Sequence, residues 1–201
     1  MKLQLKLHLV RHPQPAVDPG ICYGASNVAV TEAELSRVQA ALQAQGLPGH
    51  LPVHASPLQR CALLARRLQP ISLHLDARLA EMDFGDWEMR PWSAIPRSEV
   101  DAWAGDLLHH RPGGAENVLD VARRVDDFVA TLRAGAISAN CAGNGADSAA
   151  KHCTEALVIC HAGTIRLLLA MQSGLPLEQA ALQAAATPHR IGYGEIIMLE
   201  F

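Results

Sequence analysis

Apolar and polar positions alternate along the first part of the chain in a way that predicts strands and helices in turn. Residues 3–10 alternate and then become apolar, as a strand entering a core does. Short apolar runs at 51–55 and 71–75 predict two further strands. Between these strands, apolar residues recur at helical spacing over 31–46 and 57–69. The order strand, helix, strand, helix, strand indicates an α/β sheet.

Both of these helices begin with recognisable capping residues. Thr31 is followed three residues later by Glu34, which is a capping box, and the helix is expected to end near Gly46. In the second helix, Ser56 is the predicted N-cap and Pro57 the first helical residue. The sequence therefore indicates where each helix starts as well as which face is apolar.

The second half of the chain predicts longer elements separated by irregular segments. The segment 81–92 is rich in aromatic and acidic residues, and residues 135–154 are small, polar and glycine-rich. We expect residues 135–154 to form an exposed loop inserted in a single domain that spans residues 1–201. The remaining predicted elements are helices over 97–109, 116–132, 163–173 and 176–186, a turn at 111–117, and strands at 156–160 and 193–201.

The composition narrows the range of partners. The chain has 201 residues, of which 49% are hydrophobic, enough to bury the core of one domain. Charged residues make up 18% and the formal net charge is −3, so no basic field indicates a nucleic-acid partner. The N-terminal apolar run contains polar residues and is too short for a signal peptide or a membrane span. We therefore expect a soluble protein without nucleic-acid or membrane partners.

The five cysteines favour the cytoplasm as the compartment. Their number is odd and they contain no CxxC pair, which argues against a disulfide framework or a zinc cluster. Cysteine chemistry is an alternative, since Cys160 directly precedes His161. However, Cys160 ends a predicted buried strand, where a thiol is usually inert, and Cys22 is expected to be the more exposed thiol.

Three predicted strand ends deliver polar side chains to a turn. Arg11 and His12 follow the first strand, Arg60 lies one turn into the helix that begins at Ser56, and His161 follows a late strand. Ligands bind at the carboxyl ends of the strands in open α/β sheets, so parallel neighbours would bring these side chains into one crevice. Two arginines, two histidines and two helix N-termini make a cationic site suited to phosphate.

Each of these pieces also has a structural interpretation. A histidine at a strand end is commonly structural, and Ser56 makes a good helix start in any protein. Phe84 and Trp87 are equally interpreted as packing residues of a turn. Ten histidines leave a metal-dependent hydrolase as an alternative, although His8 and His12 lie in or at the end of a strand, where their spacing has no ligating meaning. The combination of pieces, in this order, favours the phosphate site.

Six short motifs together resemble one known family. They are VRHP at 10–13, CYGASN at 22–27, SPLQR at 56–60, EMDFGDWE at 81–88, PGGAEN at 112–117 and CHAG at 160–163. In this combination they resemble the histidine phosphatase superfamily, which includes phosphoglycerate mutase-like phosphatases. The resemblance covers nearly the whole chain, and the stretches at 22–27 and 81–88 are most similar to α-ribazole phosphatases of cobalamin assembly.

The resemblance implies both a fold and an activity. The implied fold is a three-layer α/β/α architecture of the phosphoglycerate mutase type, with a mostly parallel central sheet and a helical cap segment at about 91–115. The implied activity is that of a phosphomonoesterase that passes through a phosphohistidine and acts on a small phosphorylated metabolite, with α-ribazole 5′-phosphate as one candidate. Neither a metal ion nor a cofactor is expected, because arginines supply the positive charge.

The family's catalytic roles carry over to matching positions of this chain. His12 would attack phosphorus as the nucleophile, and Glu81 would protonate the leaving group and then activate water. The groups expected to bind the phosphoryl oxygens are Arg11, Arg60, His161, Tyr23 and Gly24. Composition alone does not distinguish Glu81 from three neighbouring acids, and one of these, Glu88, is equally a structural partner near Trp87.

The chain departs from the family pattern around the nucleophile and the phosphate pocket. Pro13 replaces the family's glycine after the nucleophile, which removes an N–H and favours an extended His12. Asp18 falls near a family asparagine and would repel phosphate unless it points away, and Asn27 replaces an aspartate. We expect these changes to leave the catalytic groups intact and to alter substrate specificity.

Alternatives to a metabolite phosphatase stay open on the sequence. They are a phosphoglycerate mutase-type phosphotransferase, a protein phosphohistidine phosphatase and a catalytically silent binder of a phosphorylated ligand. The chain lacks the long substrate-binding insertions of the mutases, and the cap segment favours a small-molecule phosphomonoester. The oligomeric state also stays open, with a dimer as one alternative.

Overall fold

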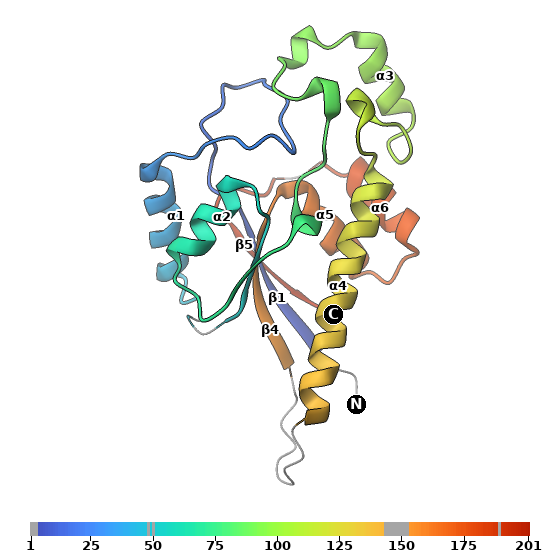
Figure 1. The fold of residues 1–201 in the computed structure, drawn as a ribbon. Helices are drawn as coiled ribbons and strands as arrows, with labels where there is room; N and C mark the ends of the chain where they lie inside the picture. Colours follow the sequence, from blue (N-terminus) through green and yellow to red (C-terminus); the bar gives the residue numbers. More distant parts are fainter. Residues whose placement is uncertain (1–3, 48, 50, 143–152, 189) are drawn as a thin grey trace.

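A five-stranded sheet forms the centre of the protein (Figure 1). The computed structural model describes residues 4–47, 49, 51–142, 153–188 and 190–201. The strands are β1 (Gln4–Arg11), β2 (Val53–Ala55), β3 (Leu73–Leu75), β4 (Cys153–Cys160) and β5 (Ile196–Glu200). The helices are α1 (Glu32–Ala44), α2 (Gln59–Arg67), α3 (Arg97–Gly105), α4 (Val118–Ala142), α5 (Ala162–Met171) and α6 (Leu177–Ala186).

Neighbouring strands of the sheet run parallel except at one edge. The order is β3-β2-β4-β1-β5, and among these strands β5 alone is antiparallel to its neighbour, β1. Strands β1 and β4 pair over their whole lengths, with Arg11 opposite Cys160 at the end. The next residues, His12 and His161, therefore leave the sheet side by side. The predicted mostly parallel sheet is confirmed.

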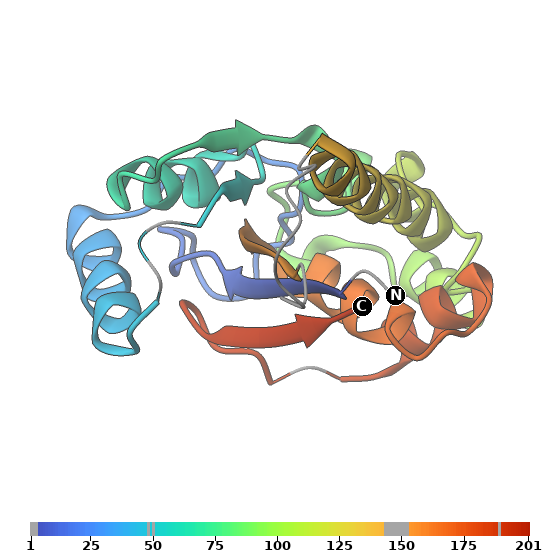
Figure 2. The same ribbon diagram turned by 90° about the horizontal axis from the view of Figure 1, so that it is seen from below.

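Helices cover both faces of the sheet, as Figure 2 shows from below. Side chains of α1 and α2, such as Val38 and Leu64, pack with Val10 of β1 on one face. Leu9, the neighbour of Val10, points to the other face and packs with residues of α4 that include Val125. Helices α5 and α6 complete that second face. The alternation along β1 thus divides the core in two, which gives the expected three layers.

The predicted cap segment lies beyond the carboxyl ends of the strands, where Figure 1 shows α3 above the sheet. A small apolar cluster of Cys22, Trp87 and Ile95 supports it, with Trp103 of α3 packed against this cluster. The indole N–H of Trp87 donates to the carboxylate of Glu99 at 2.7 Å. The cap is therefore fixed to the segment that precedes it by a core of its own.

The prediction of a loop over residues 135–154 is wrong at both ends of that range. Helix α4 was expected to end near residue 132 but continues to Ala142, and β4 already begins at Cys153. Alanine recurs at positions 134, 136, 139 and 142, and alanine is the best helix former, which offsets the glycine at 135. Residues 143–152, the middle of the expected loop, lie outside the described residues.

The start of α2 also differs from the prediction. The helix begins at Gln59, so its N-cap residue is Leu58 and not the predicted Ser56. The side chain of Leu58 makes no capping hydrogen bond. A distant residue takes that place, because Oδ1 of Asn27 accepts the N–H of Gln59 at 2.7 Å. By contrast, Thr31 caps α1 as predicted and accepts the N–H of Glu34 at 3.2 Å.

None of the described helices is both long and apolar enough to span a membrane.

Candidate active site

The site is assembled where β1, β2 and β4 end. Arg11 is the last residue of β1, and the N–H of His12 donates to the carbonyl oxygen of Cys160 at 3.0 Å. His161 is the N-cap residue of α5, which follows β4 directly. Arg60 lies in the first turn of α2, after β2. The sheet thus brings together the four cationic or imidazole side chains that the sequence singled out.

His12 is held as a neutral imidazole with one free nitrogen. Its Nδ1 lies 2.7 Å from the carbonyl oxygen of Pro13, which can only accept, so Nδ1 carries the proton. The other nitrogen, Nε2, therefore keeps its lone pair. Burial and the charge of Arg60 lower the pKa of His12 to about 3, with a smaller contribution from Arg11 and against the opposing effect of the Pro13 hydrogen bond. The imidazole is thus unprotonated and nucleophilic at neutral pH.

His161 lies beside His12 and is fully buried. The two ring centroids are 5.0 Å apart, and Nε2 of His161 is 2.9 Å from the hydroxyl oxygen of Ser56. Burial, the neighbouring His12 and the charge of Arg60 hold the pKa of His161 well below its usual value. Ser56, predicted as a helix cap, is instead the hydrogen-bond partner of a site histidine.

The two arginines are oriented by backbone carbonyl groups. Arg60 donates from Nη1 to Ser26 at 2.8 Å and from Nη2 to Gly24 at 2.5 Å. Arg11 donates from Nη1 to the carbonyl oxygen of Ile191 at 2.5 Å. Each guanidinium group therefore has one side fixed by the protein.

An aromatic residue from the end of the chain completes the support of Arg11. The guanidinium carbon of Arg11 lies 3.8 Å from the centroid of the Tyr193 ring, which is 5.6 Å from the ring of His12. The hydroxyl group of Tyr193 lies 3.1 Å from that of Tyr23. These rings confine Arg11 beside the imidazole of His12, and Tyr193 does so through a cation–π contact.

A cavity of about 360 Å³ opens over these residues. Among the described residues, five buried side-chain nitrogens have no hydrogen-bond partner, and they belong to Arg11, Arg60, His161, Trp103 and Arg166. Four of these residues line the cavity, and the fifth, His161, packs against His12. Buried donors are normally paired, so their concentration here indicates a site for an acceptor-rich ligand.

Glu81 is a wall residue of the same cavity. Its carboxylate accepts the backbone N–H of Met82 at 3.1 Å and that of Gly163 at 3.3 Å. A side chain at Gly163 would place its Cβ 2.5 Å from Oε1 of Glu81, so glycine allows the carboxylate to lie here and a larger residue would displace it. The arrangement places a carboxyl group in the cavity that contains the imidazole of His12.

Comparison with known proteins identifies the family. The sequence pattern of the Histidine phosphatase superfamily (branch 1) matches residues 7–191. The chain belongs to this superfamily.

The relatives of this chain include phosphatases from several bacteria. The adenosylcobalamin/alpha-ribazole phosphatase of Escherichia coli strain K12 is 28% identical over 187 residues, covering 87% of this chain and 82% of the relative. A putative phosphoserine phosphatase 2 of Hydrogenobacter thermophilus is 25% identical over 182 residues, covering 86% and 81%. The chain is thus related to phosphatases along most of its length.

Solved structures show the same fold. The alpha-ribazole phosphatase of Shigella flexneri superposes with a TM-score of 0.73 at 24% identity, covering 96% of this chain and 89% of that one. A mycobacterial glucosyl-3-phosphoglycerate phosphatase gives a TM-score of 0.71 at 25% identity, covering 98% and 90%. The phosphoglycerate mutase-like architecture is therefore confirmed.

In this histidine phosphatase, Glu88 has a structural role. Its carboxylate accepts backbone N–H groups of Gly24, Ala25, Ser26 and Phe84 at 2.9–3.2 Å, and the Ser26 hydroxyl group as well. Burial acts to raise the pKa of Glu88, but these hydrogen bonds together hold it below its usual value. Glu88 thus fixes the loop whose carbonyl groups orient Arg60.

The two further residues expected at the phosphate differ in their placement. Tyr23 lines the cavity, with its ring centroid 5.6 Å from the guanidinium carbon of Arg60. Gly24 is not among the residues that line the cavity. Its N–H donates to Glu88 and its carbonyl group accepts from Arg60, so the structure gives Gly24 an indirect part.

The departures from the family pattern have local explanations. The carbonyl group of Pro13 fixes the proton of His12, a function that does not need the lost N–H. Asp18 is exposed and is not among the lining residues, so its charge does not enter the cavity. Asn27 caps the start of α2 through its side-chain oxygen.

Cys22, expected to be the more exposed thiol, is fully buried. Burial and the charge of Glu88 raise its pKa to about 12.

Sequence reasoning missed residues whose importance depends on tertiary contacts. Tyr193 precedes β5 and reaches Arg11 only because β5 lies beside β1. Arg166 lies on α5 one turn after Gly163 and lines the cavity, which a helical-wheel projection from Gly163 would have indicated.

Within the described ranges, no group of three or more histidine, cysteine, aspartate or glutamate residues could hold a metal ion.

Proposed function

We propose that the protein is a phosphomonoesterase that forms a phosphohistidine on His12 and releases phosphate from a small phosphorylated metabolite. Nε2 of His12 attacks phosphorus, the bond between phosphorus and the ester oxygen breaks, and the alcohol leaves. Water then attacks phosphorus, the bond to Nε2 breaks, and inorganic phosphate is released. Two displacements at one histidine replace one difficult attack by water.

The protein groups in the cavity match the needs of this reaction. Arg11, Arg60 and His161 offer donors to the non-bridging phosphoryl oxygens, where charge increases in the transition state. Glu81 donates a proton to the leaving oxygen in the first step and accepts one from water in the second. The two guanidinium groups supply the positive charge, so the proposal assigns no step to a metal ion.

The observation that carries the proposal is the set of unpaired nitrogens around a neutral nucleophile. Arg11 Nε, Arg60 Nε and His161 Nδ1 are buried and have no partner among the described residues. Leaving a charged donor buried and unpaired costs free energy. A bound anion would accept hydrogen bonds from these donors and so remove that cost. His12 Nε2 is unprotonated in the same place because the pKa of His12 is lowered to about 3.

The rest of the cavity favours a leaving group with an apolar or aromatic part. Beyond the phosphate groups, its wall includes Phe84, Trp92 and Trp103, together with one further cation, Arg166. Planar heterocycles stack well on indole rings. This wall and the name of the relative from Escherichia coli support α-ribazole 5′-phosphate, a benzimidazole nucleotide, as the substrate to test first.

The deciding experiment measures phosphate release from a panel of esters. The panel contains α-ribazole 5′-phosphate, phosphoserine, a sugar phosphate and p-nitrophenyl phosphate, each in the presence of excess EDTA. We expect turnover of at least one ester by the wild type and none by His12→Ala, with the exposed His109→Ala as the matched control. The function is refuted if wild type and His12→Ala release phosphate equally, or if no ester is hydrolysed.

A further inference from the structure

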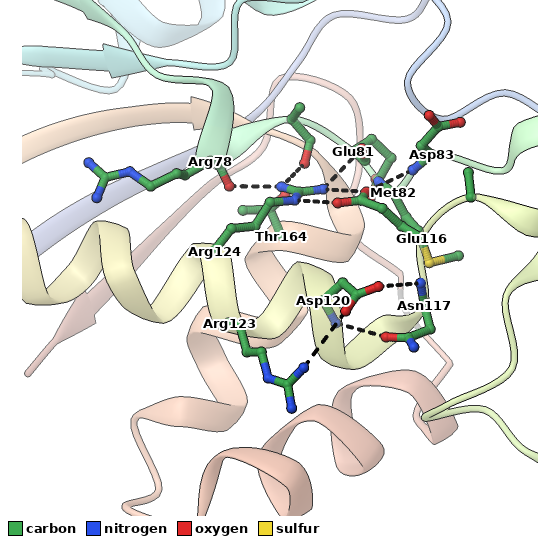
Figure 3. Close-up of polar contacts among 12 residues, drawn as sticks. Arg78, Glu81, Met82, Asp83, Glu116, Asn117, Asp120, Arg123, Arg124 and Thr164 are labelled. Atoms are coloured by element: carbon green, nitrogen blue, oxygen red, sulfur yellow. Dashed lines mark hydrogen bonds and ion pairs between the residues drawn. The ribbon is translucent and has the colours of Figure 1, made fainter.

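Arg124 of helix α4 connects this helix to the segment that carries Glu81. Figure 3 shows its guanidinium group at the centre of the contacts. Nη1 donates to the carbonyl oxygens of Arg78 at 2.8 Å and Ala80 at 2.7 Å, and Nη2 donates to that of Glu81 at 3.2 Å. Nε and Nη2 also bind both carboxylate oxygens of Glu116, at 2.9 and 3.0 Å. All five N–H donors of the arginine are thus used.

Glu116 extends the same connection beyond Glu81. Its Oε2 accepts the backbone N–H of Asp83 at 3.0 Å, and its own N–H donates to the carbonyl oxygen of Asp83 at 3.1 Å (Figure 3). The carbonyl groups of residues 78, 80 and 81 and the N–H group of residue 83 are therefore held by one ion pair, and the backbone of Glu116 holds the carbonyl group of residue 83.

Apart from these contacts, the backbone of residues 81–84 is bound at Phe84, by Glu88 and Trp87, and at Met82, by the carboxylate of Glu81 itself. Residues 81–84 belong to no helix or strand, so no ladder of backbone hydrogen bonds fixes them. The side chains of Arg124 and Glu116 are only 18% and 27% exposed, which makes their ion pair less screened by water than a surface pair. Arginine suits this place because its planar group offers five N–H donors in fixed directions, whereas an ammonium group offers three and cannot bind all of these acceptors.

We propose that Arg124, together with Glu116, is a positioning residue for Glu81. By fixing the backbone on both sides of Glu81, the ion pair keeps its carboxyl group at one place in the cavity. The inference rests on the proposed function, in which Glu81 protonates the leaving alcohol. A displacement of about 1 Å in such a group costs about 100-fold in rate, so the positioning has a measurable effect.

Esters with different leaving groups separate positioning from general structural support. An alkyl phosphate releases a strongly basic alkoxide, whose departure needs a proton from the acid. The p-nitrophenolate ion leaves without this help, because its negative charge is delocalised into the nitro group. Loss of a correctly placed acid therefore slows the alkyl ester selectively, whereas partial unfolding or a damaged phosphate pocket slows both esters alike.

The test compares kcat/KM for an alkyl phosphate and for p-nitrophenyl phosphate in Arg124→Lys, which keeps the charge but loses the planar set of donors. This parameter reports the first displacement alone, so the attack of water, in which Glu81 acts on the same phosphohistidine for both esters, does not enter it. We expect about a 100-fold loss on the alkyl ester and little change on the aryl ester. Arg123→Lys is the matched control, since Arg123 directly precedes Arg124 in α4, is exposed and pairs only loosely with Asp120 at 3.8 Å. It should leave both rates unchanged.

A double variant shows whether Arg124 acts through Glu81. Glu81→Gln alone should slow the alkyl ester selectively, and adding Arg124→Lys to it should cost nothing further on that ester. Equal losses on both esters in Arg124→Lys, an unchanged alkyl rate, or an additive loss in the double variant would each overturn the proposal. Glu81→Gln without selectivity would refute the acid role and this proposal with it, whereas the phosphohistidine is judged separately by His12→Ala.

Glu116→Gln provides a second route should Arg124→Lys fail to fold. The amide leaves Arg124 with a single acceptor oxygen in place of a carboxylate, so a smaller loss with the same selectivity for the alkyl ester is expected. A rate ratio between the two esters equal to that of the wild type, in a variant that melts at the same temperature, would contradict the positioning role.

Discussion

At the scale of single residues, the state of each imidazole follows from one hydrogen bond. The carbonyl group of Pro13 holds the proton of His12 on Nδ1, which leaves the lone pair on Nε2, the proposed nucleophile. The hydroxyl group of Ser56 contacts Nε2 of His161, which leaves its Nδ1 as the unpaired atom. Neutral imidazoles carry one N–H each, so the hydrogen-bond partner decides which nitrogen attacks and which donates.

The lowered pKa of His12 leads to a prediction about its titration. A histidine in a short peptide gains its proton near pH 6.5, whereas burial and the charge of Arg60 lower the pKa of His12 to about 3. The imidazole of His12 should therefore stay neutral as the pH falls from 7 to 5. Nuclear magnetic resonance of ring-labelled protein, with assignment through His12→Ala, measures this. A midpoint near 6.5 would contradict the buried, arginine-flanked site.

Ser56→Ala should weaken the binding of the phosphoryl group through His161. When the serine hydroxyl group donates to Nε2 of His161, it stabilises the form with the proton on Nδ1, where a phosphate oxygen can accept it. One hydrogen bond contributes about 1 kcal/mol, so kcat/KM should fall about fivefold. The exposed Ser98→Ala is the control and should change nothing. Wild-type kcat/KM in Ser56→Ala would remove Ser56 from the site.

At the scale of elements, short loops fix the catalytic groups more than helices do. Arg60 belongs to α2, but its guanidinium group is oriented by carbonyl groups of the loop around Gly24 and Ser26. That loop is fixed in turn by the carboxylate of Glu88. A carboxylate that accepts several backbone N–H groups acts much as a helix cap does, and it is expensive to replace.

Glu88→Gln should therefore weaken anion binding without removing the nucleophile. The amide group offers one acceptor oxygen in place of two and turns a donor toward backbone N–H groups, so the loop loosens and Arg60 loses its support. We expect about a tenfold rise in the inhibition constant of inorganic phosphate, from the loss of about 1.4 kcal/mol. The exposed Glu178→Gln is the control. Unchanged phosphate inhibition in Glu88→Gln would show that Arg60 is held independently of the loop.

The helices and strands also show which parts of the fold could be predicted from the sequence. Apolar spacing located the core strands, and the motif Thr31 to Glu34 correctly predicted the start of α1, because both signals are local. The start of α2 depends on Asn27, which is remote in sequence, so local reasoning placed the cap wrongly at Ser56. Helix α4 is longer than predicted because its recurring alanines favour the helix by more than its glycine and polar residues disfavour it.

At the scale of the whole molecule, the candidate site was predictable where the family motifs reach it and not beyond. The motifs name His12, His161 and the two arginines, and the parallel pairing of β1 and β4 brings the two histidines together. The partners that orient them, such as Tyr193 and Arg124, come from elements whose packing is decided by the entire core. No spacing along the chain encodes these contacts.

The stability of the fold should depend on several buried histidines at once. Burial is the first cause that lowers the pKa of His12 to about 3 and of His54 to about 4, and it also keeps the pKa of His161 well below its usual value. In the unfolded chain these groups gain protons below about pH 6.5. Between pH 6.5 and 4 the unfolded state therefore binds more protons, and the free energy of unfolding falls as the pH falls.

The expected size is up to about 1.4 kcal/mol per pH unit for each fully buried histidine, and less for the partly exposed His54. Urea denaturation at pH 7, 6 and 5 measures the slope. The carboxylates with lowered pKa values, such as Asp76, act at lower pH, because their unfolded value is 3.8. His54→Leu should reduce the slope, whereas the exposed His109→Leu should not. Equal stability at pH 7 and pH 5 would contradict the prediction.

The pairing of β1 with β4 has a consequence for how the protein reaches its native state. Arg11 is opposite Cys160, so the two strands that carry the histidines come from opposite ends of the chain. Closing so long a loop is slow compared with forming α1 or α4, because the entropy of the intervening chain is lost before the strands gain their contacts. During refolding, helix content should therefore recover before phosphatase activity does. The rate at which activity returns would then report the rate at which β1 and β4 pair.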